Sequence, residues 1–277
     1  MSDLLTSGTV ALIGWPVEHS LSPALHNHAF RQAGLDWRYL RWPVAPAHLA
    51  EVVAALAGLG FAGANITAPY KQAVIPFLDG LAPEAQAIGA VNTLVIRQGR
   101  LIGHNTDAAG FLASLTEAGF DPAGATCAVL GAGGAARAVI FSLVQAGAVV
   151  HVYNRTLEHA LTLARPGVKV HPLADLPDVP ADMRLLVNAT TLGFGSQRDR
   201  SPWPDGCPLS ARWLVYDLVY GPAPTPLLAA ARAAGARTLD GLGMLVHQAA
   251  RSFALWTGLA LPVELFWQAA RAAMQSE

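Results

Sequence analysis

Short apolar runs alternate along the first hundred residues with stretches in which apolar residues recur at helical spacing. Runs of strand length occupy residues 9–14, 37–44 and 60–66, and helical spacing occupies residues 23–33 and 47–57. This alternation is typical of an α/β domain with a largely parallel sheet. Two further apolar runs, 93–97 and 100–104, are separated only by Gln98-Gly99 and predict a hairpin that closes this first domain.

The second half of the chain opens with the pattern of a dinucleotide-binding unit. The apolar run 126–130 leads into Gly131-Ala-Gly133-Gly134-Ala-Ala136-Arg137, and an amphipathic stretch follows through Val144. The first glycine permits the tight strand-to-helix turn, Gly133 lets the backbone approach a pyrophosphate, and the small Ala136 lets helix and strand pack closely. Later strands are predicted at 185–188 and 213–220, followed by a helical tail over 244–275 that is broken at 258–262.

The end of the next predicted strand, residues 149–153, indicates which nucleotide would bind. It is followed by Asn154-Arg155-Thr156, where an NAD enzyme usually carries Asp or Glu for the ribose hydroxyls. A guanidinium suits a 2′-phosphate instead, so the sequence favours NADP over NAD. The alternative is that Arg155 is a solvated loop residue and the glycines merely make a turn; we rank it second.

Composition narrows the classes of partner. Hydrophobic residues make up 53% of the 277 and charged residues only 13%, about half the usual charged share of about 25%, so large cores are expected. Residues 52–70 carry no charge, but Gly58, Gly60, Gly63 and Pro69 interrupt them, which argues against a membrane span. A net charge of -1 without a basic stripe gives no footprint for nucleic acid. We therefore expect small-molecule partners.

Cysteine usage and the N-terminal residues point to a cytoplasmic protein without a metal. Cys127 and Cys207 show neither metal-ligand spacing nor a disulfide framework, so zinc and iron–sulfur chemistry are not expected. The N-terminal residues offer no basic segment or cleavage site typical of a secretory signal. We expect a cytoplasmic protein.

Four polar segments of the first domain lie where predicted strands end or helices begin, which is where open α/β sheets place ligands. They are residues 20–23, 65–71, 89–93 and 105–107. Lys71 stands out because it and Lys169 are the only lysines in a chain whose other strong bases are arginines. A lysine can exchange a proton, whereas an arginine effectively cannot. Each polar residue also has a structural interpretation; Ser22 and Asp107 would make good N-caps, the latter for a helix running to about Ala118.

Taken together, the motifs resemble the shikimate dehydrogenase family, whose members interconvert 3-dehydroshikimate and shikimate with NADP in aromatic amino-acid biosynthesis. The resemblance covers nearly the whole chain. The matching stretches are residues 19–23, 63–71, 89–93, 105–111, 131–137, 154–156, 188–190, 217–220 and 240–248.

The resemblance implies a two-domain α/β fold in which C-terminal helices pack back on the first domain. Residues 1–106 and 241–277 would form the substrate-binding domain, and 107–240 a Rossmann-type, doubly wound NADP-binding domain. Lys71 and Asp107 would be catalytic, with Lys71 donating a proton in ketone reduction or stabilising the developing alkoxide. Substrate ligands would be Ser20, Ser22, Asn65, Thr67, Lys71, Asn92, Asp107, Tyr220 and Gln248. Cofactor ligands would be Gly131, Ala132, Gly133, Gly134, Ala135, Ala136, Asn154, Arg155, Thr156, Thr190, Leu218, Gly241 and Met244.

Two other functions remain open on the sequence. One is a quinate and shikimate dehydrogenase with relaxed substrate or NAD use. The other, from a different class, is a catalytically silent regulator that binds shikimate or NADP; Lys71 together with Asp107 argues against it. A monomer or a homodimer is expected in either case.

Overall fold

The computed structural model describes residues 7–275, so the ends of the predicted domains, 1–6 and 276–277, lie outside the described residues. The chain divides into two compact units. The first unit comprises the residues up to Gly110 and those from Leu245 onward, and the second runs from Phe111 to Met244. The chain passes from one unit to the other within two helices, α4 (Asp107–Glu117) and α8 (Leu242–Thr257).

The first unit contains a mixed six-stranded sheet in the order β2-β1-β3-β5-β6-β4. Its strands are β1 (Ser7–Gly14), β2 (Asp36–Pro43), β3 (Phe61–Ile66), β4 (Gly80–Leu81), β5 (Thr93–Arg97) and β6 (Arg100–His104). β1 pairs in parallel with β2 and β3, while β5 runs antiparallel to β3 and β6. The predicted hairpin is confirmed, but it does not close the sheet, because the two-residue strand β4 pairs with β6 outside it.

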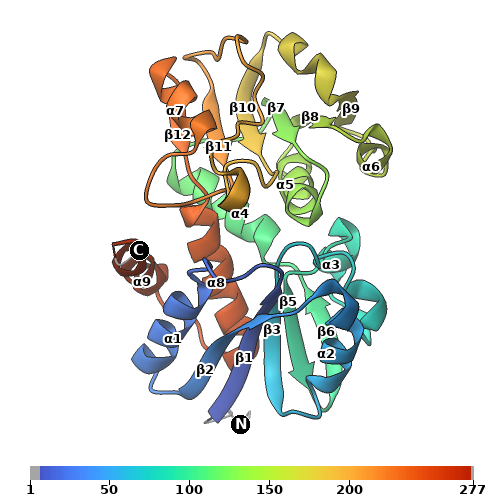
Figure 1. The fold of residues 1–277 in the computed structure, drawn as a ribbon, viewed down its shortest axis with the longest axis vertical. Helices are drawn as coiled ribbons and strands as arrows, with labels where there is room; N and C mark the ends of the chain where they lie inside the picture. The colour runs from blue at the N-terminus through green and yellow to red at the C-terminus, as the bar shows by residue number, and fades with distance from the viewer. Residues whose placement is uncertain (1–6, 276–277) are drawn as a thin grey trace. The chain divides into compact units, whose positions relative to one another are not determined.

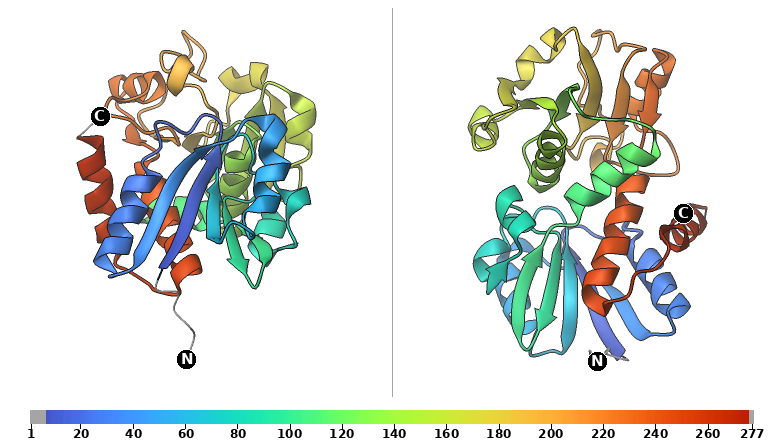
Figure 2. Two further views of the ribbon diagram at one scale, coloured as in Figure 1. Left: turned by 60° about the horizontal axis from the view of Figure 1, so that its bottom comes forward. Right: turned by 180° about the vertical axis from the view of Figure 1, so that it is seen from behind.

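Helices cover both faces of this sheet (Figures 1 and 2). On one face lie α1 (Ser22–Gln32), the part of α8 that belongs to this unit and α9 (Val263–Met274), and on the other lie α2 (Leu49–Ala55) and α3 (Pro83–Ile88). Short 3-10 turns at Pro46–His48 and Ile75–Phe77 complete the second face. The helical tail and its break are confirmed, since α8 ends at Thr257 and Gly258 adopts a left-handed φ of 74°.

The second unit contains a six-stranded, wholly parallel sheet in the order β12-β11-β10-β7-β8-β9. Its strands are β7 (Thr126–Leu130), β8 (Val149–Asn154), β9 (Val168–Pro172), β10 (Met183–Asn188), β11 (Leu214–Asp217) and β12 (Arg237–Leu239). Counted from β7, this is the Rossmann order 3-2-1-4-5-6. The strand predicted over 213–220 is too long; the chain leaves the sheet after Asp217.

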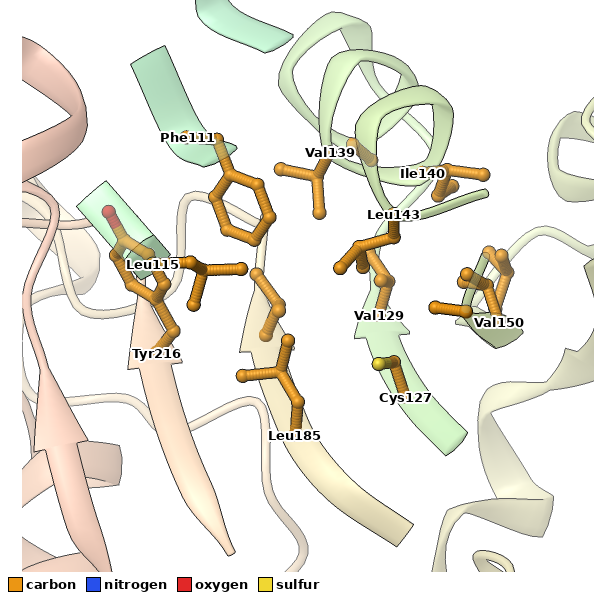
Figure 3. Close-up of a cluster of buried hydrophobic side chains, with 14 of the residues drawn as sticks. Phe111, Leu115, Cys127, Val129, Val139, Ile140, Leu143, Val150, Leu185 and Tyr216 are labelled. Carbon is orange, nitrogen blue, oxygen red and sulfur yellow. The ribbon is translucent and has the colours of Figure 1, made fainter. Parts of the chain in front are cut away.

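Two apolar layers hold the parallel sheet between helices. Phe111 and Leu115 from α4 and Val139 and Leu143 from α5 (Gly134–Gln145) pack over one face, where they meet β7 and β10 (Figure 3). The helix α6 (Leu157–Leu161) belongs to the same layer. α7 (Pro226–Ala233) and the 3-10 segment Leu173–Asp178 cover the other face. Another 3-10 turn spans Gly195–Gln197.

The close approach of α5 to β7 depends on the glycine turn between them. Gly131 has a φ of 108°, and a Cβ at this position would lie 3.1 Å from the carbonyl oxygen of Ala189. Only glycine adopts this conformation without strain. Ala136 is fully buried against the sheet, as the motif predicts.

The described helices include none that combines the length and the apolar character needed to span a bilayer.

Candidate active site

The chemical centre of the first unit is an ion pair. Lys71 Nζ lies 2.6 Å from Asp107 Oδ2, and the two side chains are 16% and 5% exposed. Lys71 belongs to the loop after β3, and its carbonyl accepts from the backbone N–H of Val91 at 2.7 Å. The other carboxylate oxygen, Asp107 Oδ1, accepts from Asn92 Nδ2 at 2.9 Å. A buried carboxylate that accepts from a cation and an amide is held in one orientation.

The predicted helix caps are wrong, and the reason bears on the site. Asn105 Oδ1, not Asp107, accepts from the backbone N–H of Ala108 in the first turn of α4, at 3.3 Å. Ser22 is the first residue of α1 rather than its N-cap, which is Leu21, and the N-cap residue makes no side-chain cap bond. Because Asn105 takes over the capping, both oxygens of Asp107 are available to Lys71 and Asn92.

Asn65 and Asn92 are fixed by bonds inside the first unit. Asn65 Nδ2 donates to the carbonyl of Asn92 at 3.0 Å, and its Oδ1 accepts from the hydroxyl of Tyr39 at 2.8 Å. Asn92 Oδ1 accepts from the backbone N–H of Thr106 at 2.7 Å, which turns its Nδ2 toward Asp107. The structure thus brings Asn65, Asn92, Asp107 and Lys71 together from β3, the β5 approach and the start of α4.

Gln248 completes this group from α8. Its Oε1 accepts from Asn92 Nδ2 at 3.3 Å, and its Nε2 donates to the carbonyl of Leu245 at 2.9 Å. Leu245 lies in the same helix as Gln248, but Asn92 lies far away in the sequence. The contact with Asn92 is therefore visible only in the folded structure.

The two serines predicted for a carboxylate lie close to each other at the start of α1. Ser20 Oγ accepts from the backbone N–H of Ser22 at 3.3 Å. Arg41 on β2 donates from Nη2 to the carbonyl of Ser20 at 2.8 Å. The sequence analysis missed Arg41, because nothing in its own strand pattern connects it with a loop 21 positions earlier. Thr67, half-buried, follows β3.

The predicted cofactor residues all belong to the second unit and follow the carboxyl ends of its strands, with Tyr220 after β11. Gly133, exposed and extended, is the N-cap of α5; no side chain caps this helix and no acidic residue occupies its first turn. Its first N–H groups therefore face an environment suited to an anion. Gly241 packs so tightly on Leu218 that a Cβ would lie 1.9 Å from the carbonyl oxygen of Leu218. Met244, in contrast, is buried in the core beside α4 and α5.

The end of β8 carries a cation and no carboxylate. Asn154 Nδ2 donates to the carbonyl of Thr156 at 2.7 Å, which closes a tight loop, and Arg155 between them is exposed. A Rossmann unit for NAD places an acidic side chain at this strand end.

Asp217 and Asn188 form a buried pair that supports two of the loops predicted to hold the cofactor. Asp217, fully buried, accepts from Asn188 Nδ2 at 2.8 Å, from the Val219 N–H at 3.1 Å and from the Thr225 hydroxyl at 2.7 Å. Burial raises the pKa of this carboxyl to about 6, although the three donors oppose that rise. Asn188 in turn accepts from the backbone N–H of Thr190 at 2.9 Å. The sequence indicated this pair only through the motif stretches 188–190 and 217–220, in which neither residue was given a role.

The strand order, the glycine turn and the uncapped N-terminus of α5 define the class of the second unit, which is a dinucleotide-binding Rossmann domain. It is joined in one chain to an α/β unit that holds the ion pair of Lys71 with the buried Asp107. Family models place the chain more closely. The model of the shikimate dehydrogenase substrate-binding domain matches residues 12–94, that of shikimate / quinate 5-dehydrogenase residues 114–192, and that of the shikimate 5′-dehydrogenase C-terminal domain residues 241–271. The chain belongs to the shikimate dehydrogenase family.

Relatives match over nearly the full length. The chain is 47% identical to the shikimate dehydrogenase (NADP(+)) of Moorella thermoacetica, over 97% of this chain and 94% of that protein. It is 44% identical to the enzyme of the same name from Methanopyrus kandleri, over 95% and 94%. The crystal structure of shikimate 5-dehydrogenase from Thermus thermophilus with NADP(H) and shikimate superposes with a TM-score of 0.85 at 42% identity, covering 96% of this chain and 99% of that one.

The same fold also serves another reductase. The 5-ketofructose reductase of a Gluconobacter strain is similar with a TM-score of 0.79 at 34% identity, over 96% of this chain and 98% of that one. The fold alone therefore does not choose the substrate, and the polar residues of the first unit must.

Proposed function

We propose that this protein is an NADP-dependent shikimate dehydrogenase, which reversibly reduces 3-dehydroshikimate to shikimate on the route to aromatic amino acids. The observation that carries the proposal is the contact of Lys71 with the buried Asp107, 2.6 Å apart, in a chain of this family. A carbonyl oxygen that becomes an alkoxide needs a proton, and a lysine can supply one where the many arginines of this chain cannot.

The hydrogen-bond donors and the cation of the second unit suit the phosphate groups of NADP. The N–H groups at the start of α5, with an added Cβ on Gly133 meeting nothing within 4 Å, suit a pyrophosphate. The exposed guanidinium of Arg155 and the missing carboxylate at the end of β8 suit a 2′-phosphate. When bound, NADPH supplies the hydride. The residues that would hold it are Gly131, Ala132, Gly133, Gly134, Ala135, Ala136, Asn154, Arg155, Thr156, Thr190, Leu218, Gly241 and Met244.

Lys71 and Asp107 handle the proton. The ammonium of Lys71 gives one proton to the substrate oxygen as its C=O bond becomes C–O⁻, and regains one from solvent afterwards. In alcohol oxidation the proton moves in the opposite direction. Asp107 stays an acceptor and holds Nζ in place through its 2.6 Å contact, while Asn92 fixes the carboxylate from the other side. Stabilisation of the alkoxide by the ammonium without complete transfer is the close alternative, and it requires the same residue.

The remaining polar side chains would recognise the acid and its ring hydroxyls. Ser20 and Ser22 suit the carboxylate, because hydroxyl and backbone N–H donors gather there. The amides and hydroxyls that suit the ring are those of Asn65, Thr67, Asn92, Tyr220 and Gln248. A site that matches hydroxyls in this way strongly rejects analogues that lack them.

Initial rates of the purified protein with shikimate or quinate, each with NADP or NAD, test this proposal. Turnover confined largely to shikimate with NADP supports it. A preference for quinate, which one of the matching family models names, or for NAD would retain the chemistry and replace the substrate or cofactor. Binding without turnover would make the protein a silent regulator.

The proposed setting is the cytoplasm, with small molecules as partners and no role for nucleic acid, membrane or a bound metal. A monomer or a homodimer is proposed, and light scattering after gel filtration distinguishes the two.

A further inference from the structure

Three buried hydroxyls, none of them in the proposed catalytic or binding set, connect the amides of the first unit. They are Thr93 on β5, Thr106 before α4 and Ser252 on α8, and each is at most 4% exposed. Ser252 is the centre of the three. Its Oγ lies 2.8 Å from Thr93 Oγ1, 3.1 Å from Thr106 Oγ1 and 3.2 Å from Asn65 Nδ2.

The orientation of the Asn65 amide is fixed by a backbone carbonyl, which can only accept a hydrogen bond. The carbonyl of Asn92 can only accept, so Asn65 must face it with Nδ2 and must face the hydroxyl of Tyr39 with Oδ1. One Nδ2 proton goes to that carbonyl. The other is left for the oxygens of Thr93 and Ser252, both within 3.2 Å.

The direction at Gln248 is fixed in the same way. Leu245 presents a carbonyl that can only accept, and Asn92 presents an NH₂ group that only donates. Gln248 must therefore place Nε2 toward the first and Oε1 toward the second. Thr106 Oγ1 also lies 3.4 Å from this Oε1. Within residues 7–275, the second Nε2 proton of Gln248 has no hydrogen-bond partner.

We propose that Ser252 is a positioning residue that holds the amides of Asn65 and Gln248 in the orientations that their fixed partners set. Ser252 Oγ lies within hydrogen-bond distance of Asn65 Nδ2, and Thr106 Oγ1 connects it with Gln248 Oε1 at 3.4 Å and with Asn92 Oδ1 at 3.2 Å. Because Gln248 Oε1 faces Asn92 and Thr106, and one Nε2 proton goes to Leu245, one N–H of Gln248 remains for a substrate oxygen. Ser252 acts through Asn65 and Gln248 and does not itself contact the substrate. The inference rests on the proposed function, because it assumes that Gln248 contacts the substrate.

The variant Ser252→Ala removes the oxygen at the centre of these hydrogen bonds. Because one buried hydrogen bond to a ligand group is lost or misdirected, we expect the KM for shikimate to rise about tenfold, with kcat changed less than about threefold and the KM for NADP unchanged. The matched control is Ser142→Ala in α5, since Ser142 is buried to a similar degree and its hydroxyl donates only to the carbonyl of Val139. The control should keep both KM values. Ser252→Cys restores volume but bonds weakly, so it should keep most of the KM increase.

A second measurement does not depend on substrate. In ¹⁵N spectra, the side-chain NH₂ protons of Asn65 and Gln248 should exchange with water faster in Ser252→Ala than in the wild type or in Ser142→Ala. Faster exchange together with a selective rise in the KM for shikimate supports the proposal. Unchanged amide exchange, an unchanged KM, or a KM fully restored by Ser252→Cys overturns it. If the wild-type protein fails to turn over shikimate, the proposed function fails, and the exchange measurement still decides whether Ser252 orders these amides.

Discussion

Asp107 and Asp217 are both buried carboxylates, one in each unit, and their surroundings differ in one respect. Asp107 accepts from the ammonium of Lys71 and from one amide, whereas Asp217 accepts only from neutral donors on Asn188, Val219 and Thr225. Without a cation, burial raises the pKa of Asp217 to about 6. The comparison separates two uses of one residue type: Asp107 holds the ammonium proposed to transfer a proton, and Asp217 ties together loops that carry Thr190 and Leu218.

Removing the cation should have the largest effect. Lys71→Ala is expected to lower kcat about 1,000-fold because the proton donor is lost, while the affinity for NADP stays within about twofold of the wild type. Steady-state rates and calorimetric titration with NADP measure the two quantities. Lys169→Ala, at the only other lysine, exposed on β9, is the control and should leave both unchanged. A loss of NADP affinity as large as the loss of rate would refute the role of Lys71.

Removing the charge of Asp107 while keeping its shape should have the second-largest effect on the rate. In Asp107→Asn, one amide oxygen can still accept from Asn92, but the amide nitrogen then faces Lys71 Nζ, and two donors meet. We expect kcat to fall about 100-fold, with near-wild-type stability in urea. Pre-steady-state rates of NADPH oxidation check this. Full activity of the variant would show that Lys71 needs no counter-charge.

The third change concerns Arg155, an exposed cation, in contrast to Lys71. Arg155→Ala should weaken NADP about 30-fold, because a charge-assisted contact with phosphate is lost, and should alter the affinity for NAD less than threefold. Fluorescence titration with both nucleotides measures this. Equal weakening of NADP and NAD would remove the basis for the proposed cofactor choice.

The smallest expected effect concerns the pH dependence of stability. Because the folded pKa of Asp217 lies above its value of 3.8 in the unfolded chain, the folded state holds the proton more tightly. The corresponding stabilisation is complete below pH 3.8 and is lost as the pH rises through about 6. It amounts to about 3 kcal/mol. The wild type should therefore lose stability relative to Asp217→Asn between pH 4 and 7.

Urea unfolding of both proteins across this pH range tests that loss. The difference in unfolding free energy between them should change with pH in the stated direction. A difference that stays constant from pH 4 to 7 would contradict the raised pKa. The turnover of Asp217→Asn should stay within about threefold of the wild type, unlike that of Asp107→Asn.

Local patterns predicted the elements that have a regular apolar sequence. The hairpin 93–97 and 100–104, the strand 126–130 and the helices on both sides of Gly258 were found because their patterns need no distant partner. The strands β9 and β12 were missed because Lys169 and Arg237 interrupt short, half-exposed edge segments. Edge strands lack the continuous apolar signal of a buried strand.

The candidate site divides in the same way. Residue type alone singled out Lys71, and the resemblance to a known family supplied Asp107 and the amides. The connections among them could not be predicted, because Asn65 meets Ser252 across 187 positions and Asn92 meets Gln248 across 156. The capping role assigned to Asp107 was wrong for a related reason: capping propensity is local, and it cannot show that Asn105 would take that role.

The return of the chain through α8 has a consequence for biosynthesis. A ribosome that has translated up to Met244 has synthesised every strand of the parallel sheet, but the first unit still lacks Gln248, Ser252 and the indole of Trp256, whose Nε1–H donates to the carbonyl of Leu94. The residues up to Gly110 must wait with buried polar groups unpaired until α8 has been made. The strands of the second unit are all made before α8, whereas the first unit acquires its final form only after α8 has been made.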